Sequence, residues 1–68
     1  MKLTIDREAD ALYLKLDEAP TAESNEISPG VILDYNAEGK VVGIEMLYLS
    51  QRVPDGNFSR MEMETVGV

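Results

Sequence analysis

Three acidic residues at alternate positions, Asp6, Glu8 and Asp10, have the spacing with which carboxylates begin a calcium-binding loop. An EF-hand loop also needs glycine at its sixth position and a bidentate glutamate at its twelfth. Ala11 and Asp17 occupy those two positions here. We therefore interpret the three acids as capping and turn residues and expect no metal ion. They stay the candidates for a carboxylate-only site that would bind divalent cations without selectivity.

A second acidic pair, Asp34 and Glu45, is expected on one face of a hairpin. Paired carboxylates perform glycoside hydrolysis, but a catalytic pair needs a cleft deep enough to shift one pKa. A chain of 68 residues has little material for such a cleft, and it contains no histidine to serve as a general base or to activate a serine. We therefore expect no catalytic residue, no cofactor and no enzymatic activity, and we interpret the pair as surface carboxylates that limit aggregation.

Charge decides which partners suit this chain. It carries thirteen acidic and six basic side chains, for a net charge of −7. Nucleic acids and anionic membranes are bound mainly through lysine and arginine, so we expect neither as a partner. The sequence shows no apolar stretch long enough to span a bilayer, and none that follows Lys2 as in a signal peptide. We expect a cytoplasmic protein.

The small size of the chain predicts that it associates with itself. A domain this small buries about 60% of the surface of its unfolded chain, and its core rarely supplies more than roughly 3–5 kcal/mol. No cysteine is present, so no disulfide can add stability. We expect a homodimer to supply what the core does not.

Alternating apolar and polar residues predict an antiparallel sheet of four to five short strands. The third strand is polar, which is typical of a sheet edge. The expected strands are Lys2–Ile5, Ala11–Asp17, Ala22–Ile27, Val31–Tyr35 and Lys40–Tyr48. Ser28–Val31 matches a type II turn. Residues 60–66 alternate again, and form either a last strand or a tail that becomes ordered on a partner.

The hairpin of residues 31–48 has a predicted register. A four-residue loop, Asn36–Gly39, would pair Tyr35 with Lys40, Leu33 with Val42 and Val31 with Ile44. This register gathers apolar side chains on one face. The face expected to form the core carries Leu3, Ile5, Leu12, Leu14, Leu16, Ile27, Val31, Leu33, Val42, Ile44 and Met46.

The opposite face of the hairpin is too apolar for free solvation and too charged for a core. We expect part of it to be covered, and Gly43 leaves a gap that a large neighbour such as Tyr13 can fill. Tyrosine is also enriched at protein interfaces. The interface candidates are Tyr13, Ile32, Asp34, Val41, Glu45 and Leu47.

Three sequence blocks in a fixed order resemble a known family. They are residues 6–14 (DREADALYL), 28–35 (SPGVILDY) and 39–47 (GKVVGIEML). Over about residues 1–50 the chain resembles the small bacterial domain-of-unknown-function family numbered 2283. Arg7 stands where the family often has proline. The resemblance implies a small β-rich fold, no established activity or site residue, and, from the gene context of some members, an antitoxin-like or other partner-binding role.

Together these observations predict a mainly β domain, with a small α+β fold as the variant: an antiparallel β-meander with a C-terminal covering segment. Residues 1–50 would form the domain, and residues 51–68 a C-terminal loop and last strand that belong to it or become ordered on a partner. The expected function is that of a small acidic protein-interaction module that binds a basic partner. The alternative is a domain that binds a small ligand or a divalent cation through surface carboxylates.

Overall fold

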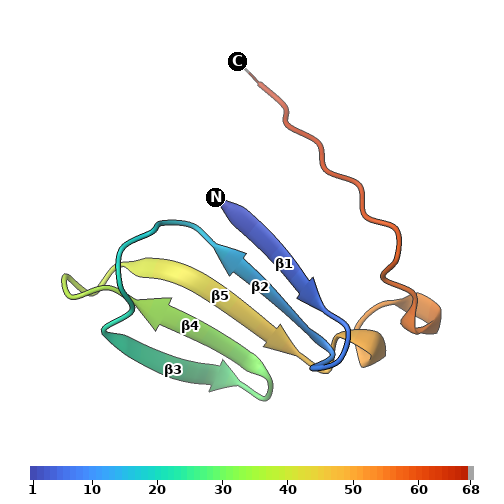
Figure 1. Ribbon diagram of the computed structural model, residues 1–68, viewed down its shortest axis with the longest axis horizontal. Coiled ribbons are helices and arrows are strands. Elements are labelled where there is room, and N and C mark those ends of the chain that lie inside the picture. The colour runs from blue at the N-terminus through green and yellow to red at the C-terminus, as the bar shows by residue number, and fades with distance from the viewer. Residues whose placement is uncertain (68) are drawn as a thin grey trace.

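A single antiparallel sheet makes up most of the chain (Figure 1). The computed structural model describes residues 1–67. The strands and 3-10 helices are β1 (Lys2–Asp6), β2 (Ala11–Lys15), β3 (Glu23–Ser28), β4 (Val31–Tyr35), β5 (Val41–Leu47), η1 (Leu49–Gln51) and η2 (Pro54–Gly56). The predicted fold class, mainly β and antiparallel, is confirmed.

The strand order, β1-β2-β5-β4-β3, departs from a simple meander at one point. The chain leaves β2 and crosses one end of the sheet to the far edge, where it begins β3 (Figure 1). β5 then returns to the centre, between β2 and β4. This order places the polar β3 at an edge, as predicted, and the apolar-rich β5 between two neighbours.

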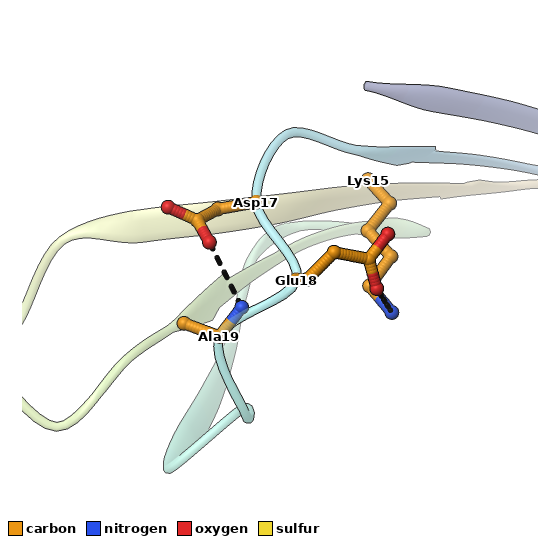
Figure 2. Close-up of polar contacts among 4 residues, drawn as sticks. All are labelled: Lys15, Asp17, Glu18 and Ala19. Carbon is orange, nitrogen blue, oxygen red and sulfur yellow. Dashed lines mark hydrogen bonds and ion pairs between the residues drawn. The ribbon is translucent and has the colours of Figure 1, made fainter.

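The crossing segment, residues 16–22, is tied down by hydrogen bonds at both ends. The Leu16 amide donates to the Val42 carbonyl at 2.8 Å, and the Ala22 amide donates to the Tyr35 carbonyl at 2.8 Å. Figure 2 shows the turn between these ends, where an Asp17 carboxylate oxygen accepts a hydrogen bond from the Ala19 amide at 2.9 Å. The crossing is therefore an ordered part of the sheet's end.

An ion pair lies beside this turn (Figure 2). The Lys15 ammonium nitrogen and a Glu18 carboxylate oxygen are 3.1 Å apart, with the Glu18 side chain largely exposed. Exposed pairs of this kind contribute about 0–1 kcal/mol. The pair therefore orients the start of the crossing without adding much to stability.

The predicted register of the β4–β5 hairpin is wrong by two residues. Leu33 pairs with Ile44, and Val31 pairs with Met46. One residue of the difference arises because the loop is closed by Asn36, whose amide donates to the Lys40 carbonyl at 2.8 Å. The other arises from a bulge between the Asp34 and Tyr35 pairings. Two shifts of one residue preserve the face of every side chain, so the apolar residues still gather on one face.

Two rows of apolar side chains cross one face of the sheet through these pairings. We call this surface the apolar face; its rows are Leu3, Leu14, Ile44 and Leu33, and Ile5, Leu12, Met46 and Val31. The opposite surface, which we call the polar face, carries the alternate residues of the same strands.

The expected core is much less buried than predicted. Among the residues of the expected core only Val42 is buried, and Leu49 is the second buried apolar side chain in the described part of the chain. Leu3 and Leu16 are 40% and 41% exposed, and Ile27 is 54% exposed. Ile27 is the extra residue of a bulge in β3, between the pairs that Glu26 and Ser28 form, so it falls outside the apolar rows.

The C-terminal segment covers little of the apolar face. Residues 57–67 form no helix or strand, so the predicted last strand is absent there. In Figure 1 this segment leads away from the sheet. Met61 and Met63, 50% and 83% exposed, line a groove of about 310 Å³ whose other walls include Leu3 and Leu14. The covering segment therefore contacts the face only beside β1, and the apolar rows are left partly exposed: Leu3 is 40% exposed, and the other seven residues are neither fully buried nor fully exposed.

Two side chains that follow β5 fasten the end of the sheet. Both carboxylate oxygens of Asp10 accept hydrogen bonds from Ser50, from its amide at 2.9 Å and its hydroxyl at 2.7 Å. Arg52 donates from Nε to the Leu47 carbonyl at 2.7 Å and from Nη2 to the Pro29 carbonyl at 2.8 Å. Together they hold the β1–β2 turn and the β3–β4 turn against the end of β5.

Candidate functional site

A polar cluster lies on the polar face, centred on Asp34. Asp34 is the buried charged residue of the described chain, 4% exposed, and its Oδ1 accepts a hydrogen bond from the Ser24 hydroxyl at 2.6 Å. Tyr13 and Glu45, a directly opposed pair on β2 and β5, reach the same carboxylate from the other side. We call Tyr13, Ser24, Asp34 and Glu45 the polar cluster.

Gly43 makes this arrangement possible. It pairs with Asp34 in the sheet, and a Cβ atom added to it would lie 2.7 Å from the Tyr13 hydroxyl oxygen and 3.2 Å from Asp34 Oδ2. Real Cβ atoms almost never approach an oxygen so closely. Tyr13 therefore lies over Gly43, as the sequence predicted, and its hydroxyl reaches across β5 to β4.

The cluster changes the acidity of two of its members. Burial, then the hydrogen bond to Asp34 and its negative charge, raise the pKa of Tyr13 above its usual value. Burial and the neighbouring Asp34 carboxylate raise the pKa of Glu45 in the same way. Ionised Glu45 is therefore disfavoured in the folded chain relative to the unfolded chain.

This pKa shift predicts that Glu45→Gln stabilises the protein at neutral pH. The pKa of Glu45 is higher in the folded chain than in the unfolded chain. The folding stability that Glu45 contributes is therefore fully present below the unfolded pKa and is lost as pH rises through the folded pKa. A neutral amide removes that loss. We expect the variant to unfold at higher urea concentration than the wild type at pH 7, and the gain to vanish below about pH 4.

Glu38→Gln is the matched control, because Glu38 is exposed in the β4–β5 loop. It removes one negative charge without touching the polar cluster. Urea midpoints at both pH values, at one fixed protein concentration, measure the effect. Equal changes in the two variants would contradict the assignment.

A groove of about 330 Å³ opens on the polar face next to the cluster. Two carboxylate residues and one aromatic residue line it, with small and apolar residues between them. Its walls are Thr4, Asp6, Ala9, Ala11, Leu12, Tyr13, Glu45 and Leu47. Acidic, aromatic and apolar residues thus line the same groove.

The structure brings five of the six interface candidates to one face. Tyr13, Ile32, Asp34, Glu45 and Leu47 occupy alternate positions on β2, β4 and β5, and pairings link them across the polar face. The sixth candidate does not join them: Val41 pairs with Tyr35, because the bulge inserts an extra residue before Gly43.

The three candidates for cation binding are engaged differently. Asp6 accepts a hydrogen bond from the Ala9 amide at 3.0 Å, which is the turn role expected of it. Asp10, with a left-handed φ of 53°, has both carboxylate oxygens bound to Ser50. Glu8 lies exposed in the same turn. Within residues 1–67 no group of three or more acidic, histidine or cysteine side chains is placed to hold a metal ion.

One protein family matches the part of the chain that forms the sheet. The family described as "Protein of unknown function (DUF2283)" matches residues 2–50, which include all five strands and the Asp10–Ser50 contact. The chain belongs to the DUF2283 family. No curated protein and no solved structure matches it. No helix in residues 1–67 is long and apolar enough to cross a membrane.

Sequence reasoning missed three residues that this DUF2283 chain uses. Ser24 lies in the predicted polar edge strand, residues 22–27, without a predicted role, and no role is predicted for Ser50 or Arg52. Arg52 lies beyond the family match yet joins two turns. In the structure the Arg52 contact is tight at Gly30, whose φ is +75° and where an added Cβ would lie 2.6 Å from Arg52 Nη2; the sequence shows only a turn glycine at that place.

Proposed function

We propose that this protein is a non-enzymatic, cytoplasmic interaction module that binds a basic segment of a partner protein in the groove of the polar face. The groove's composition carries the proposal. Two acidic residues, Asp6 and Glu45, line it together with the aromatic Tyr13, and Ala11 and Leu47 supply apolar surface.

An arginine or lysine side chain suits such a groove. Its aliphatic part can lie along apolar walls while its charged end meets carboxylates at the margin. Arginine adds a planar group that stacks on aromatic rings and bonds carboxylates in pairs. A partner cation also favours the ionised form of Glu45, which the free protein disfavours. Binding would thus remove an unfavourable feature of the unbound state.

The charge of the whole chain supports the same partner. A net charge of −7 attracts basic proteins at long range and speeds their encounter, with an effect that salt weakens. Such attraction does not by itself select a binding place, and the groove supplies that place. An antitoxin-like role, suggested by the family resemblance, would be one case of this kind of binding.

A short arginine-rich peptide tests the proposal. We expect binding to the wild type that weakens as salt rises, and that also weakens as pH falls, because protonation of Glu45 removes a negative charge from the groove at a higher pH than for an ordinary carboxyl. Calorimetric titration gives the affinity, and chemical-shift changes should centre on Tyr13 and Leu47.

Two variants of equal charge separate groove binding from general attraction. Glu45→Gln removes a groove carboxylate and is expected to weaken peptide binding about tenfold, which corresponds to roughly 1.4 kcal/mol. Glu38→Gln removes a carboxylate of the distant β4–β5 loop and should change the affinity much less. Equal losses in both, or shifts spread evenly over all acidic residues, would reject the groove as the binding place.

A further inference from the structure

We infer that the apolar face binds a second copy of this chain, apolar face to apolar face, so that two single sheets form one two-layer sandwich. This contact uses the apolar face, whereas the groove proposed for a basic partner lies on the polar face. One sheet is one layer, and stable domains bury the apolar side of a sheet against a second layer.

The chain exposes more area than a compact monomer of its mass. The chain exposes 5389 Å², whereas a folded monomer of its 7.5 kDa mass is expected to expose roughly 4,250 Å². The excess is about 1,100 Å², shared between the extended residues 57–67 and the sheet. A standard protein interface buries about 800 Å² on each partner. Covering the apolar face would therefore bring the exposed area close to the ordinary value.

The overall dimensions agree with this comparison. The radius of gyration is 13.3 Å, against about 11 Å for a compact domain of 68 residues. The shortest dimension of the molecule is 19 Å, and its other two are 38 and 35 Å. The larger dimensions include the extended residues 57–67, and the strands themselves form a single layer (Figure 1). A second sheet at the usual separation of about 10 Å would give the apolar face its second layer.

Charge selects a second copy as the occupant. The two rows of the apolar face contain no charged residue, while Asp6, Glu26, Asp34 and Glu45 lie on the other face. The remaining strand acid, Glu23, pairs with Tyr35 at the outer edge strand, beyond the end of the rows. Two copies can therefore stack the apolar rows without burying like charges between them, although each carries a net charge of −7. A partner selected for its basic charge would find nothing to pair with on this face.

The tail is a poor occupant of the same surface. Met61 and Met63 line a groove only with residues of the N-terminus, β1 and β2, and both remain at least half exposed. Ile44 and Leu33, in the middle of the face, are not among the residues that line this groove. A two-fold dimer also leaves both polar faces outward, so each dimer would present two grooves of the proposed kind.

Sedimentation velocity on the full chain alone, at high salt, tests this inference. We expect twice the 7.5 kDa mass of the chain, and the dimer should persist as salt rises because apolar contacts hold it together. Leu14→Glu and Leu3→Glu, which introduce charges into one apolar row, should give folded monomers by circular dichroism. Leu3 is 40% exposed at the edge strand, so its variant retains the fold even if Leu14→Glu does not.

Matched controls make the outcome decisive. Thr4→Glu places the same charge on the same strand but on the polar face, and it should stay dimeric. A double variant, Met61→Glu and Met63→Glu, should also stay dimeric. A monomeric wild type, or loss of the dimer in the Thr4 or tail variants but not in Leu3→Glu, would overturn the inference. Because no peptide is present, this result is independent of the arginine-peptide titration.

Discussion

Asp34→Ala is expected to lower the free energy of unfolding by about 3 kcal/mol, since hydrogen bonds to a charged group contribute about 1.5–3 kcal/mol each. Asp34 is almost fully buried, accepts a hydrogen bond from the Ser24 hydroxyl and interacts with the Tyr13 hydroxyl. Removing it leaves the Ser24 hydroxyl without its acceptor and the Tyr13 hydroxyl without its neighbouring carboxylate. Relief of its repulsion with Glu45 offsets part of the loss, which is why the expected cost is at the lower end of the sum of two such interactions.

A loss of that size would remove most of the stability of so small a domain, for which roughly 3–5 kcal/mol is typical. Urea unfolding followed by circular dichroism measures it, at one fixed protein concentration because association adds to apparent stability. Asp34→Asn, which keeps one carbonyl acceptor for Ser24, should cost less. Glu38→Ala is the surface control, expected within about 0.5 kcal/mol of the wild type. An Asp34→Ala midpoint equal to that of Glu38→Ala would show that the cluster does not stabilise the fold.

Gly43→Ala is the second substitution with a large expected effect. The added methyl would meet the Tyr13 hydroxyl oxygen at 2.7 Å, so Tyr13 must move away from Asp34. Overpacking of this kind costs about 1–3 kcal/mol. Alanine is otherwise the better strand residue, because glycine loses more backbone entropy on folding. A loss of stability would therefore come from the contact of the added methyl with Tyr13 and not from a change in backbone entropy.

A double-mutant cycle isolates that contact. Tyr13→Phe removes the oxygen nearest to the added methyl, so Gly43→Ala should cost less in the Tyr13→Phe background than in the wild type. A coupling of at least about 0.5 kcal/mol is expected for residues in direct contact. Additive effects of the two substitutions would place Tyr13 elsewhere than over Gly43.

The alternation of apolar residues was enough to predict the strands and the faces of most of their residues, with Ile27 and Val41 as exceptions. The same alternation could not predict the bulges. Without the bulge in β3, the Ser28–Val31 turn would pair Asn25 with Asp34; the extra residue brings Ser24 to that place instead. The hydroxyl partner of the buried carboxylate is therefore decided by a backbone irregularity that has no clear signal in this sequence.

The contacts between distant loops could not be predicted from local sequence patterns either. Asp10 and Ser50 are forty positions apart, and they meet because β5 pairs with β2. A meander predicts β2 beside β3, which would separate them. By contrast, the position of Tyr13 over Gly43 was predictable, because a glycine inside a strand leaves space for a large residue on a neighbouring strand.

The two faces of the sheet thus have separate roles in this account: the polar face is organised around Asp34, and the apolar face is a binding surface for the same chain. Isotope-filtered NMR on a mixture of labelled and unlabelled chains examines the apolar face directly. The account predicts intermolecular contacts among methyl groups of Leu14, Leu33 and Ile44. If these methyl groups contact only residues of their own chain, with Met61 and Met63 lying over them, the single-layer sheet covers itself and the account is contradicted.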